Sequence, residues 1–373
     1  MQVDVVIVGG GVIGLSAAIR CADAGLSVTV LDPDPGRGAS WAAAGLLAPV
    51  AELHYGEDAL LRLNLASSAL WAAWAAELRD RGVDVGYVAC GSLMVARDAD
   101  DAAELHRLMD TQQRLGLSVS WLRGRDARAA EPNLAPSTRG AVRVDGDHQV
   151  DNRALVEGLA HLAERIPTVT VRRHTVMRVD HEAGRVCGVT LADGTTVAGQ
   201  TVVVAAGAGS GRIGGLGGLL PAIRPVKGQL LHLRSPAGPL ARANLRGLEV
   251  YIVNRPDGRI VIGATVEERG FDTQVTAGGV HELLRAAREL VPGIDECTFV
   301  EATAGLRPGS PDNAPVLGRV AEVQGLLLAT GHYRNGVLLS PLTADAVAAW
   351  ASGGTPPDAV IPFGPMRLDG ALA

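Results

Sequence analysis

The chain has 373 residues, enough for two domains and a large core. Its 34 basic and 40 acidic residues give a formal net charge of −6 without any lysine or arginine block, which argues against nucleic acid or an acidic membrane surface as a partner. Four widely spaced cysteines indicate neither a metal site nor a disulfide framework, and the N-terminus lacks the basic segment of a signal peptide.

The first elements follow a strand–helix–strand pattern. Residues 5–14 read VVIVGGGVIG, an apolar strand that runs into a glycine-rich turn. We expect a helix over 15–24 and a second strand over 26–32. This order is typical of a domain that binds a dinucleotide.

Each glycine of the turn has a physical role in such a site. Gly9 allows the tight turn, Gly11 lets the backbone approach a pyrophosphate, and Gly14 lets the helix pack closely on the strand. The diphosphate would then meet the free N–H groups at the helix N-terminus. Asp32 follows Gly14 by 18 residues, close to the roughly 20-residue spacing of a carboxylate that binds an adenosine ribose.

The next segment favours FAD over NAD. Residues 40–49 read SWAAAGLLAP, and three alanines with a glycine let the main chain approach a large flat ligand. An NAD domain would continue with another strand–helix unit. On composition alone, a closely packed helix of small residues explains the same segment. The apolar stretch 59–78 contains Arg62 and Asn64 and is not a convincing membrane span.

The middle of the chain predicts a helix followed by antiparallel strands. Acidic residues at 145, 147 and 151 and His148 precede an amphipathic helix over 152–164, and we interpret them as loop residues with Asp151 or Asn152 as the helix cap. Strands over 188–191 and 196–197 flank a hairpin turn, and a buried strand follows over 201–206. These strands indicate an antiparallel piece beside the dinucleotide sheet.

The last elements predict a second site at a helix N-terminus. An apolar strand over 325–329 leads into a glycine-flanked turn over 330–336 and a helix from about 337 to 350. The N-terminus of this helix could also face a cofactor.

Taken in order, these segments resemble the D-amino-acid-oxidase-like FAD oxidoreductases, in particular the glycine oxidases of the thiamine pathway. The resemblance covers residue 3 to about 350 and rests on the glycine turn and on segments 40–45, 204–208, 225–229, 251–253, 263–265, 305–308 and 331–336. It implies an α/β (α+β) fold with a discontinuous, Rossmann-like FAD domain, residues 1–82, 141–218 and 300–373. A substrate domain on an antiparallel sheet would comprise residues 83–140 and 219–299.

The resemblance also implies which residues bind FAD. Related sarcosine oxidases attach their flavin to a cysteine near position 307, but Gly305 and Leu306 offer no thiol, so we expect non-covalent FAD. The implied binding residues, with Val176 acting through its backbone, are Gly9, Gly11, Val12, Ile13, Gly14, Asp32, Pro33, Ala39, Ser40, Ala44, Gly45, Leu46, Val176, His332, Tyr333, Arg334, Asn335, Gly336, Val337 and Leu338.

Three residues are candidates for binding the substrate. In the family, positions matching Arg307 and Arg334 contact the substrate, and a guanidinium binds a carboxylate with two hydrogen bonds. The Tyr251 hydroxyl, on the strand over 250–253, could reach the same carboxylate or act as a small gate. Pro308 is expected to end regular structure after Arg307. An isolated arginine is more often a solvated or helix-capping residue, and a strand tyrosine is often simply half-buried.

The resemblance implies oxidative deamination of glycine or a similarly small amine. Hydride transfer from Cα to flavin N5 would give an imine, then glyoxylate and ammonia, with oxygen reduced to hydrogen peroxide; this needs orientation, and no catalytic side chain or metal is assigned. A sarcosine or small D-amino-acid oxidase or dehydrogenase is an alternative, as is a non-catalytic flavin-binding subunit. We expect a cytoplasmic, homo-oligomeric protein that serves thiazole assembly.

One position departs from the family pattern. Glu249 stands where glycine oxidases often carry a histidine, two residues before Tyr251. Because alternate strand residues share a face, Glu249 could point toward the pocket and raise the pKa of the substrate amine. The simpler interpretation places it at the solvent-exposed start of the strand.

Overall fold

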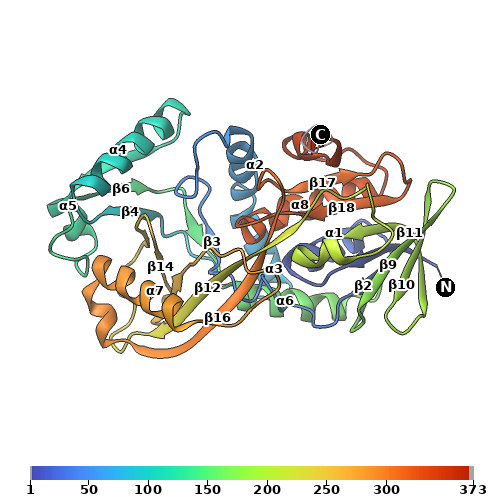
Figure 1. Ribbon diagram of the computed structural model, residues 1–373, viewed down its shortest axis with the longest axis horizontal. Helices are drawn as coiled ribbons and strands as arrows, with labels where there is room; N and C mark the ends of the chain where they lie inside the picture. The colour runs from blue at the N-terminus through green and yellow to red at the C-terminus, as the bar shows by residue number, and fades with distance from the viewer. Residues whose placement is uncertain (1, 369–373) are drawn as a thin grey trace.

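Two large β-sheets divide the molecule into two lobes (Figure 1). The structure, a computed structural model, describes residues 2–368. The lobe that carries the N-terminal strand lies on the right of the view, and the other lies on the left. Two long strands of the second sheet, β12 (Arg224–Arg234) and β16 (Thr298–Gly309), pair along their length and run toward the first sheet.

The first sheet has a parallel core with antiparallel additions. Its main order is β17-β18-β11-β1-β2-β8, with β9 and β10 attached through β11. β8, β2, β1, β11 and β18 pair in parallel, whereas β17, β9 and β10 pair antiparallel. The strands are β1 (Val3–Val8), β2 (Val28–Leu31), β8 (Val169–Arg172), β9 (Val176–Glu182), β10 (Arg185–Leu191), β11 (Thr196–Val204), β17 (Val316–Arg319) and β18 (Leu326–Thr330).

Both faces of this sheet are covered, which explains the continuous apolar run of β1. Val5 and Ile7 face a core built with helices α1 (Val12–Asp23), α6 (Asn152–Arg165) and α8 (Gly336–Ala351). Val6 and Val8 face the opposite core, which residues of β9 and β10 help to form. The inserted antiparallel piece predicted from the sequence is therefore confirmed.

The helices near the cavity differ from the predicted ones mainly at their ends. The first helix starts at Val12, three residues earlier than predicted, directly after the N-cap Gly11. Asp151 caps α6 and accepts hydrogen bonds from the N–H groups of Arg153 and Ala154, as predicted. α8 agrees with its predicted range to within one residue at each end.

The second sheet is antiparallel except for one pair. Its order is β16-β12-β15-β14-β13-β4-β6-β5, and only β13 and β4 run parallel. Its remaining strands are β4 (Ser92–Ala96), β5 (Val119–Arg123), β6 (Gly140–Val144), β13 (Asn244–Arg246), β14 (Tyr251–Asn254) and β15 (Arg259–Gly263).

Helices α4 (Ala99–Arg114), α5 (Gly124–Ala130) and α7 (Ala277–Leu290) accompany the second sheet (Figure 1). α7 buries Leu283, Ala286, Ala287 and Leu290, an i, i+3, i+4, i+7 stripe, in the core of this sheet. β6 and β16 both belong to the sheet, so it extends past the domain boundaries expected at 140/141 and 299/300. The division into domains stays a proposal.

Smaller elements complete the chain. A two-stranded sheet pairs β3 with β7, and no helix within residues 2–368 is long and apolar enough to cross a membrane. These elements are β3 (Leu46–Leu47), β7 (His148–Gln149), α2 (Asp58–Ser68), α3 (Trp71–Asp80) and the 3₁₀ helices η1 (Gly207–Arg212), η2 (Pro292–Glu296), η3 (Asp358–Phe363) and η4 (Pro365–Leu368).

Helix α8 contains a proline and is anchored by side chains around it. Pro341 has no N–H to donate to the carbonyl of Val337, and the Ser340 hydroxyl donates to that carbonyl instead, at 2.9 Å. The carbonyl of Leu338 accepts hydrogen bonds from the Ser67 hydroxyl at 2.7 Å and the Trp71 indole at 2.8 Å. These contacts hold the first turn of α8 against α2 and α3.

Two buried tryptophans of α3 test this anchor. Trp71→Phe removes a buried hydrogen bond, whereas the Trp74 indole N–H has no partner, so Trp74→Phe removes none. We expect Trp71→Phe to lower the free energy of unfolding by about 1–2 kcal/mol more than Trp74→Phe. Urea unfolding of both variants measures this difference, and equal losses would contradict the anchoring role.

Candidate active site

A cavity of about 830 Å³ lies between the two sheets, a volume typical of ligand pockets. It is lined by all of the predicted cofactor-binding residues except Gly9, Gly14 and Val176, and also by Arg307 and Tyr251. Segments that are distant in sequence meet here, because the glycine turn, the N-terminus of α8 and the strands β14 and β16 converge on one space.

Gly9 and Gly14 shape the turn without lining the cavity. Gly9 has a φ of +112°, and a Cβ atom there would overlap the carbonyl of Ala205. A Cβ on Gly14 would overlap the carbonyl of Gly9. Without side chains at these two positions, the turn can pack against the end of β11 and the first turn of α1 can pack against the end of β1.

The N-terminus of α1 opens toward the cavity as a diphosphate site requires. Gly11 gives this helix no side-chain cap, and a Cβ on Gly11 would lie 3.2 Å from the Ser40 hydroxyl. That hydroxyl accepts a hydrogen bond from the Val12 N–H at 3.0 Å. The cradle thus consists of backbone N–H groups and one hydroxyl, donors that suit a phosphate.

Asp32 holds the glycine turn as well as facing the cavity. Its carboxylate accepts hydrogen bonds from the N–H groups of Gly10 and Asp34, both at 2.7 Å. A carboxylate has further lone pairs, so a ribose hydroxyl can still donate to it. Asp32 is therefore oriented before any ligand binds.

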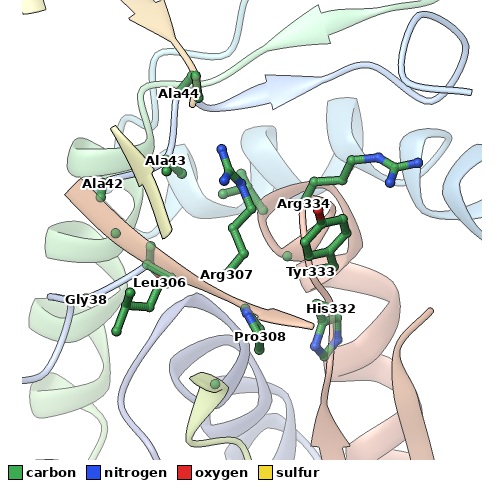
Figure 2. Close-up of a pocket in the computed structure, with 18 of the residues that line it drawn as sticks. Gly38, Ala42, Ala43, Ala44, Leu306, Arg307, Pro308, His332, Tyr333 and Arg334 are labelled. Carbon is green, nitrogen blue, oxygen red and sulfur yellow. The ribbon is translucent and has the colours of Figure 1, made fainter. Parts of the chain in front are cut away.

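The small-residue segment forms turns instead of a helix. Residues 38–45 wind along the cavity wall, and Ala42, Ala43 and Ala44 lie beside it (Figure 2). A Cβ on Gly45 would overlap the carbonyl of Val150. The main chain is therefore open to a flat ligand, as expected for a flavin.

Val176 lies away from the cavity lining. It starts β9 and pairs with Leu191 of β10. The backbone contact with FAD that the resemblance implies for Val176 stays a prediction.

The turn before α8 forms the other end of the cavity. The Tyr333 N–H donates to the carbonyl of Pro308 at 3.0 Å, which joins this turn to β16. His332 is buried, and its Nε2 lies 3.1 Å from the Thr343 hydroxyl. Burial lowers the pKa of His332 to about 3, so its imidazole is neutral and carries no charge to the cofactor.

The expectation that Pro308 ends regular structure is wrong. β16 continues through Pro308 to Gly309, and Pro308 pairs opposite Pro225 of β12. β16 is the edge strand of its sheet, where a proline costs no ladder hydrogen bond.

Arg307 points from β16 into the cavity (Figure 2). Its hydrogen bonds within residues 2–368 use only Nη1, which donates to the carbonyls of Thr265 at 3.1 Å and Lys227 at 3.4 Å. Nε and Nη2 therefore remain for a ligand. A Cβ on Gly228 would overlap the guanidinium, so this strand glycine makes the space that Arg307 occupies.

Tyr251 lies next to Arg307 on the same wall. Burial raises the pKa of its phenol, and the nearby positive charge of Arg307 acts in the opposite direction. A Cβ on Gly263 would overlap the phenol oxygen. The phenol is thus a neutral hydroxyl beside a guanidinium, an arrangement that suits a carboxylate ligand.

Arg334 is engaged by carboxylates. Figure 2 shows its side chain extending away from Arg307. Its Nη2 donates to the Glu57 carboxylate and, at 3.2 Å, to the carbonyl of Glu52, and its Nε lies 3.5 Å from a Glu52 carboxylate oxygen. Glu52 also pairs with Arg246. Of the two predicted carboxylate-binding arginines, only Arg307 has no carboxylate partner among the described residues, although Nε of Arg334 makes no hydrogen bond.

Glu249 lies at the outer rim of the cavity. β14 starts at Tyr251, so Glu249 precedes the strand and the rule of alternate faces does not apply. Its side chain is 52% exposed and pairs with Arg285 at 3.0 Å and Arg97 at 3.6 Å. The structure supports the solvent-exposed interpretation.

A fully buried lysine holds one wall of the cavity. The Nζ of Lys227 lies 2.8 Å from an Asp272 carboxylate oxygen and 3.9 Å from one of Glu267. Lys227 and Glu267 also exchange two main-chain hydrogen bonds. Residues 266–273, which contain both carboxylates, contribute Val266 and Phe271 to the cavity lining. Lys227 is therefore a positioning residue for this segment.

We expect Lys227→Met to loosen the segment without unfolding the protein. Local opening exposes a chain to proteolysis, and the exposed Arg269 is a trypsin site within the segment. Cleavage after Arg269 should become several-fold faster relative to cleavage after Arg125, whose side chain is 90% exposed. Mass spectrometry of the native protein under trypsin measures this ratio.

The control is Glu268→Gln. Glu268 lies in the same segment, and its replacement removes an exposed ion pair with Arg224 of β12 but leaves the contacts of Lys227 in place. An unchanged cleavage ratio in Lys227→Met, or an equal rise in the control, would show that Lys227 does not hold the segment.

The sequence reasoning missed Glu52, Glu57, Arg246 and Lys227. The contacts that give them a role join residues about 40 to 280 positions apart, and Lys227 is in addition a buried charge; no local sequence pattern marks either feature.

Comparison with known proteins agrees with this geometry. The family model described as "DAO: FAD dependent oxidoreductase" matches residues 4–350. The chain is 38% identical to a glycine oxidase of Geobacillus kaustophilus over 349 residues, 92% of each protein. A crystal structure of glycine oxidase from the same species superposes with a TM-score of 0.92 at 36% identity, covering 98% of this chain and 99% of the other.

A second solved structure, iminodiacetate oxidase from Chelativorans sp. BNC1, has a TM-score of 0.89 at 28% identity and covers 97% of this chain and 98% of its own. The family match spans nearly the whole chain, and the diphosphate cradle and the open main chain at 38–45 fit its cofactor. The chain belongs to the DAO family of FAD-dependent oxidoreductases.

Proposed function

We propose that this protein is an FAD-dependent oxidase of glycine or a similarly small amino acid or amine. The observation that carries the proposal is the free edge of the Arg307 guanidinium beside the neutral Tyr251 hydroxyl, at the end of the cavity where β16 meets the turn before α8. The identity of about one third or more with glycine oxidases supports the same substrate class.

The side chains of the cavity bind and orient the substrate. Arg307 would bind the substrate carboxylate through Nε and Nη2 while its Nη1 stays on the Thr265 carbonyl. Tyr251 would add a hydroxyl contact to the same carboxylate. A carboxylate held at two points limits rotation of the amino acid, and such positioning is worth several kcal/mol.

FAD, held at the N-terminus of α1 and along segment 38–45, would supply the redox chemistry, a two-electron oxidation of the substrate coupled to reduction of oxygen to hydrogen peroxide. The neutral substrate amine becomes an imine, which water converts to glyoxylate and ammonia. His332 is assigned no chemical role: burial keeps its imidazole neutral, and its Nε2 lies 3.1 Å from the Thr343 hydroxyl.

The proposal also covers how FAD is attached, which electron acceptor is used, and where and in which assembly the protein works. FAD is held without a covalent bond to cysteine, since no described residue of the cavity lining is a cysteine and Cys297 lies at the far end of β16 from Arg307. We propose oxygen as the acceptor, a cytoplasmic homo-oligomer, and a role in supplying the imine for thiazole assembly in thiamine synthesis.

Two alternatives make different predictions. A sarcosine or small D-amino-acid oxidase or dehydrogenase would use the same Arg307 anchor with other substrates. A non-catalytic flavin-binding subunit would bind FAD and oxidise nothing. The free donors of Arg307 favour an enzyme over a subunit.

Hydrogen peroxide release with glycine, sarcosine, D-alanine and D-proline discriminates these alternatives. We expect glycine to give the highest kcat/KM, or to share it with sarcosine. Dye reduction without peroxide would indicate a dehydrogenase. If none of the four amines reduces oxygen or a dye, the subunit alternative holds.

Replacing Arg307 tests the carboxylate anchor. Arg307→Ala should retain flavin and lose at least about thirtyfold in kcat/KM, because removing one partner of a buried charged contact costs about 2–5 kcal/mol. Arg307→Lys should recover little, since an ammonium cannot match the planar fork. Steady-state kinetics with glycine, with the exposed Arg125→Ala as control, measures both effects. Activity of Arg307→Ala within a few-fold of the parent would place the anchor elsewhere.

A further inference from the structure

Besides Arg307 and the exposed Arg37, which stacks on Trp41, two mostly buried arginines line the same cavity, and one carboxylate lies between them. Arg246 is the last residue of β13, and Arg334 lies in the turn before α8. One carboxylate oxygen of Glu52 pairs with Arg246, and the other lies 3.5 Å from Nε of Arg334. All three side chains are mostly buried, with exposures of 15% for Glu52, 23% for Arg246 and 16% for Arg334.

The main chain around Glu52 is anchored independently of these ion pairs. The N–H groups of Val50 and Ala51 donate to the fully buried Asp147 carboxylate at 3.2 and 3.1 Å. The carbonyl of Glu52 accepts from Arg334. The backbone that carries Glu52 is therefore fixed by Asp147 on one side and by Arg334 on the other, without any ligand.

Among the described residues, no carboxylate pairs with Arg307. Glu52 and Glu57 neutralise Arg246 and Arg334, whereas Arg307 donates to backbone carbonyls and lies beside the neutral Tyr251 phenol. A substrate with one carboxylate matches this balance. A second carboxylate on the substrate would have to displace Glu52 from Arg246 and Arg334, or it would lie unpaired beside the negative charges of Glu52 and Glu57. Both outcomes are unfavourable.

We propose that Glu52 determines specificity by occupying Arg246 and Arg334, so that the pocket accepts amino acids with one carboxylate and rejects those with two. Iminodiacetate, which is glycine with a second carboxymethyl group on nitrogen, is such a rejected dicarboxylate. The fold alone does not exclude it, because the iminodiacetate oxidase compared above has the same fold. The inference rests on the proposed function for its substrates, but its binding test does not.

Glu52→Gln tests the proposal with an isosteric, neutral side chain. The ratio of kcat/KM for iminodiacetate to kcat/KM for glycine should rise at least about tenfold, because two guanidinium groups lose their shared carboxylate partner. Glu52→Asp keeps the charge and should stay closer to the parent ratio. Flavin content and thermal unfolding show whether each variant is folded.

The matched control is Glu249→Gln. It also removes one negative charge at the cavity, but Glu249 pairs with Arg97 and Arg285 outside it. The ratio should therefore remain that of the parent. If Glu52→Gln does not fold, Glu57→Gln, which frees Arg334 from one of its two carboxylates, should give a smaller rise in the same direction.

A second readout needs no turnover. Calorimetric titration of the flavin-loaded protein with malonate and acetate compares a dicarboxylate with a monocarboxylate, neither of which carries an amine to oxidise. Glu52→Gln should tighten malonate binding relative to acetate by about the same factor as the kinetic ratio.

Unchanged ratios in folded, flavin-containing Glu52→Gln would overturn the proposal, as would an equal rise in Glu249→Gln, which would assign the effect to overall charge. A parent protein that oxidises no small amine would contradict the proposed function, and the malonate and acetate titration would still decide the role of Glu52.

Discussion

The site depends on the junction between the two sheets, where the Tyr333 N–H donates to the carbonyl of Pro308 and His332 forms a β-bridge with Gly309. Tyr333 lies in the turn between β18 of the first sheet and α8, and Pro308 lies on β16 of the second. This junction places the residue before Pro308, Arg307, next to the N-terminus of α8. The dinucleotide cradle and the carboxylate anchor therefore open into one cavity although different sheets supply them.

Charge balance inside that cavity then decides what it can bind. Guanidinium groups in a poorly hydrated space need partners, and the structure gives Arg246 and Arg334 carboxylates from segment 52–57. Arg307 has backbone carbonyls and the neutral Tyr251 phenol beside it but no carboxylate among the described residues, which leaves its charge for a ligand. Neutral His332 and Tyr251 add hydrogen-bonding groups without changing this balance.

The parts that the sequence predicted are those with local causes. The apolar run of β1, the glycines after it and the amphipathic α6 each follow from a short pattern, and motif resemblance located Arg307 and Tyr251. The Pro308 expectation failed because strand pairing with β12 overrides the local preference of proline at a sheet edge. The roles of Glu52 and Lys227 depend on long-range or buried-charge contacts, which no local pattern reveals.

Anaerobic mixing of the flavin-loaded protein with glycine tests the central claim, that the cavity orients a small amino acid for oxidation by FAD. The visible absorbance of the oxidised flavin should bleach at a rate that saturates with glycine concentration, and admitting oxygen should restore it. Dithionite provides the control that the bound flavin can be reduced. Absorbance that persists with glycine, sarcosine and small D-amino acids, while dithionite bleaches it, would contradict the claim.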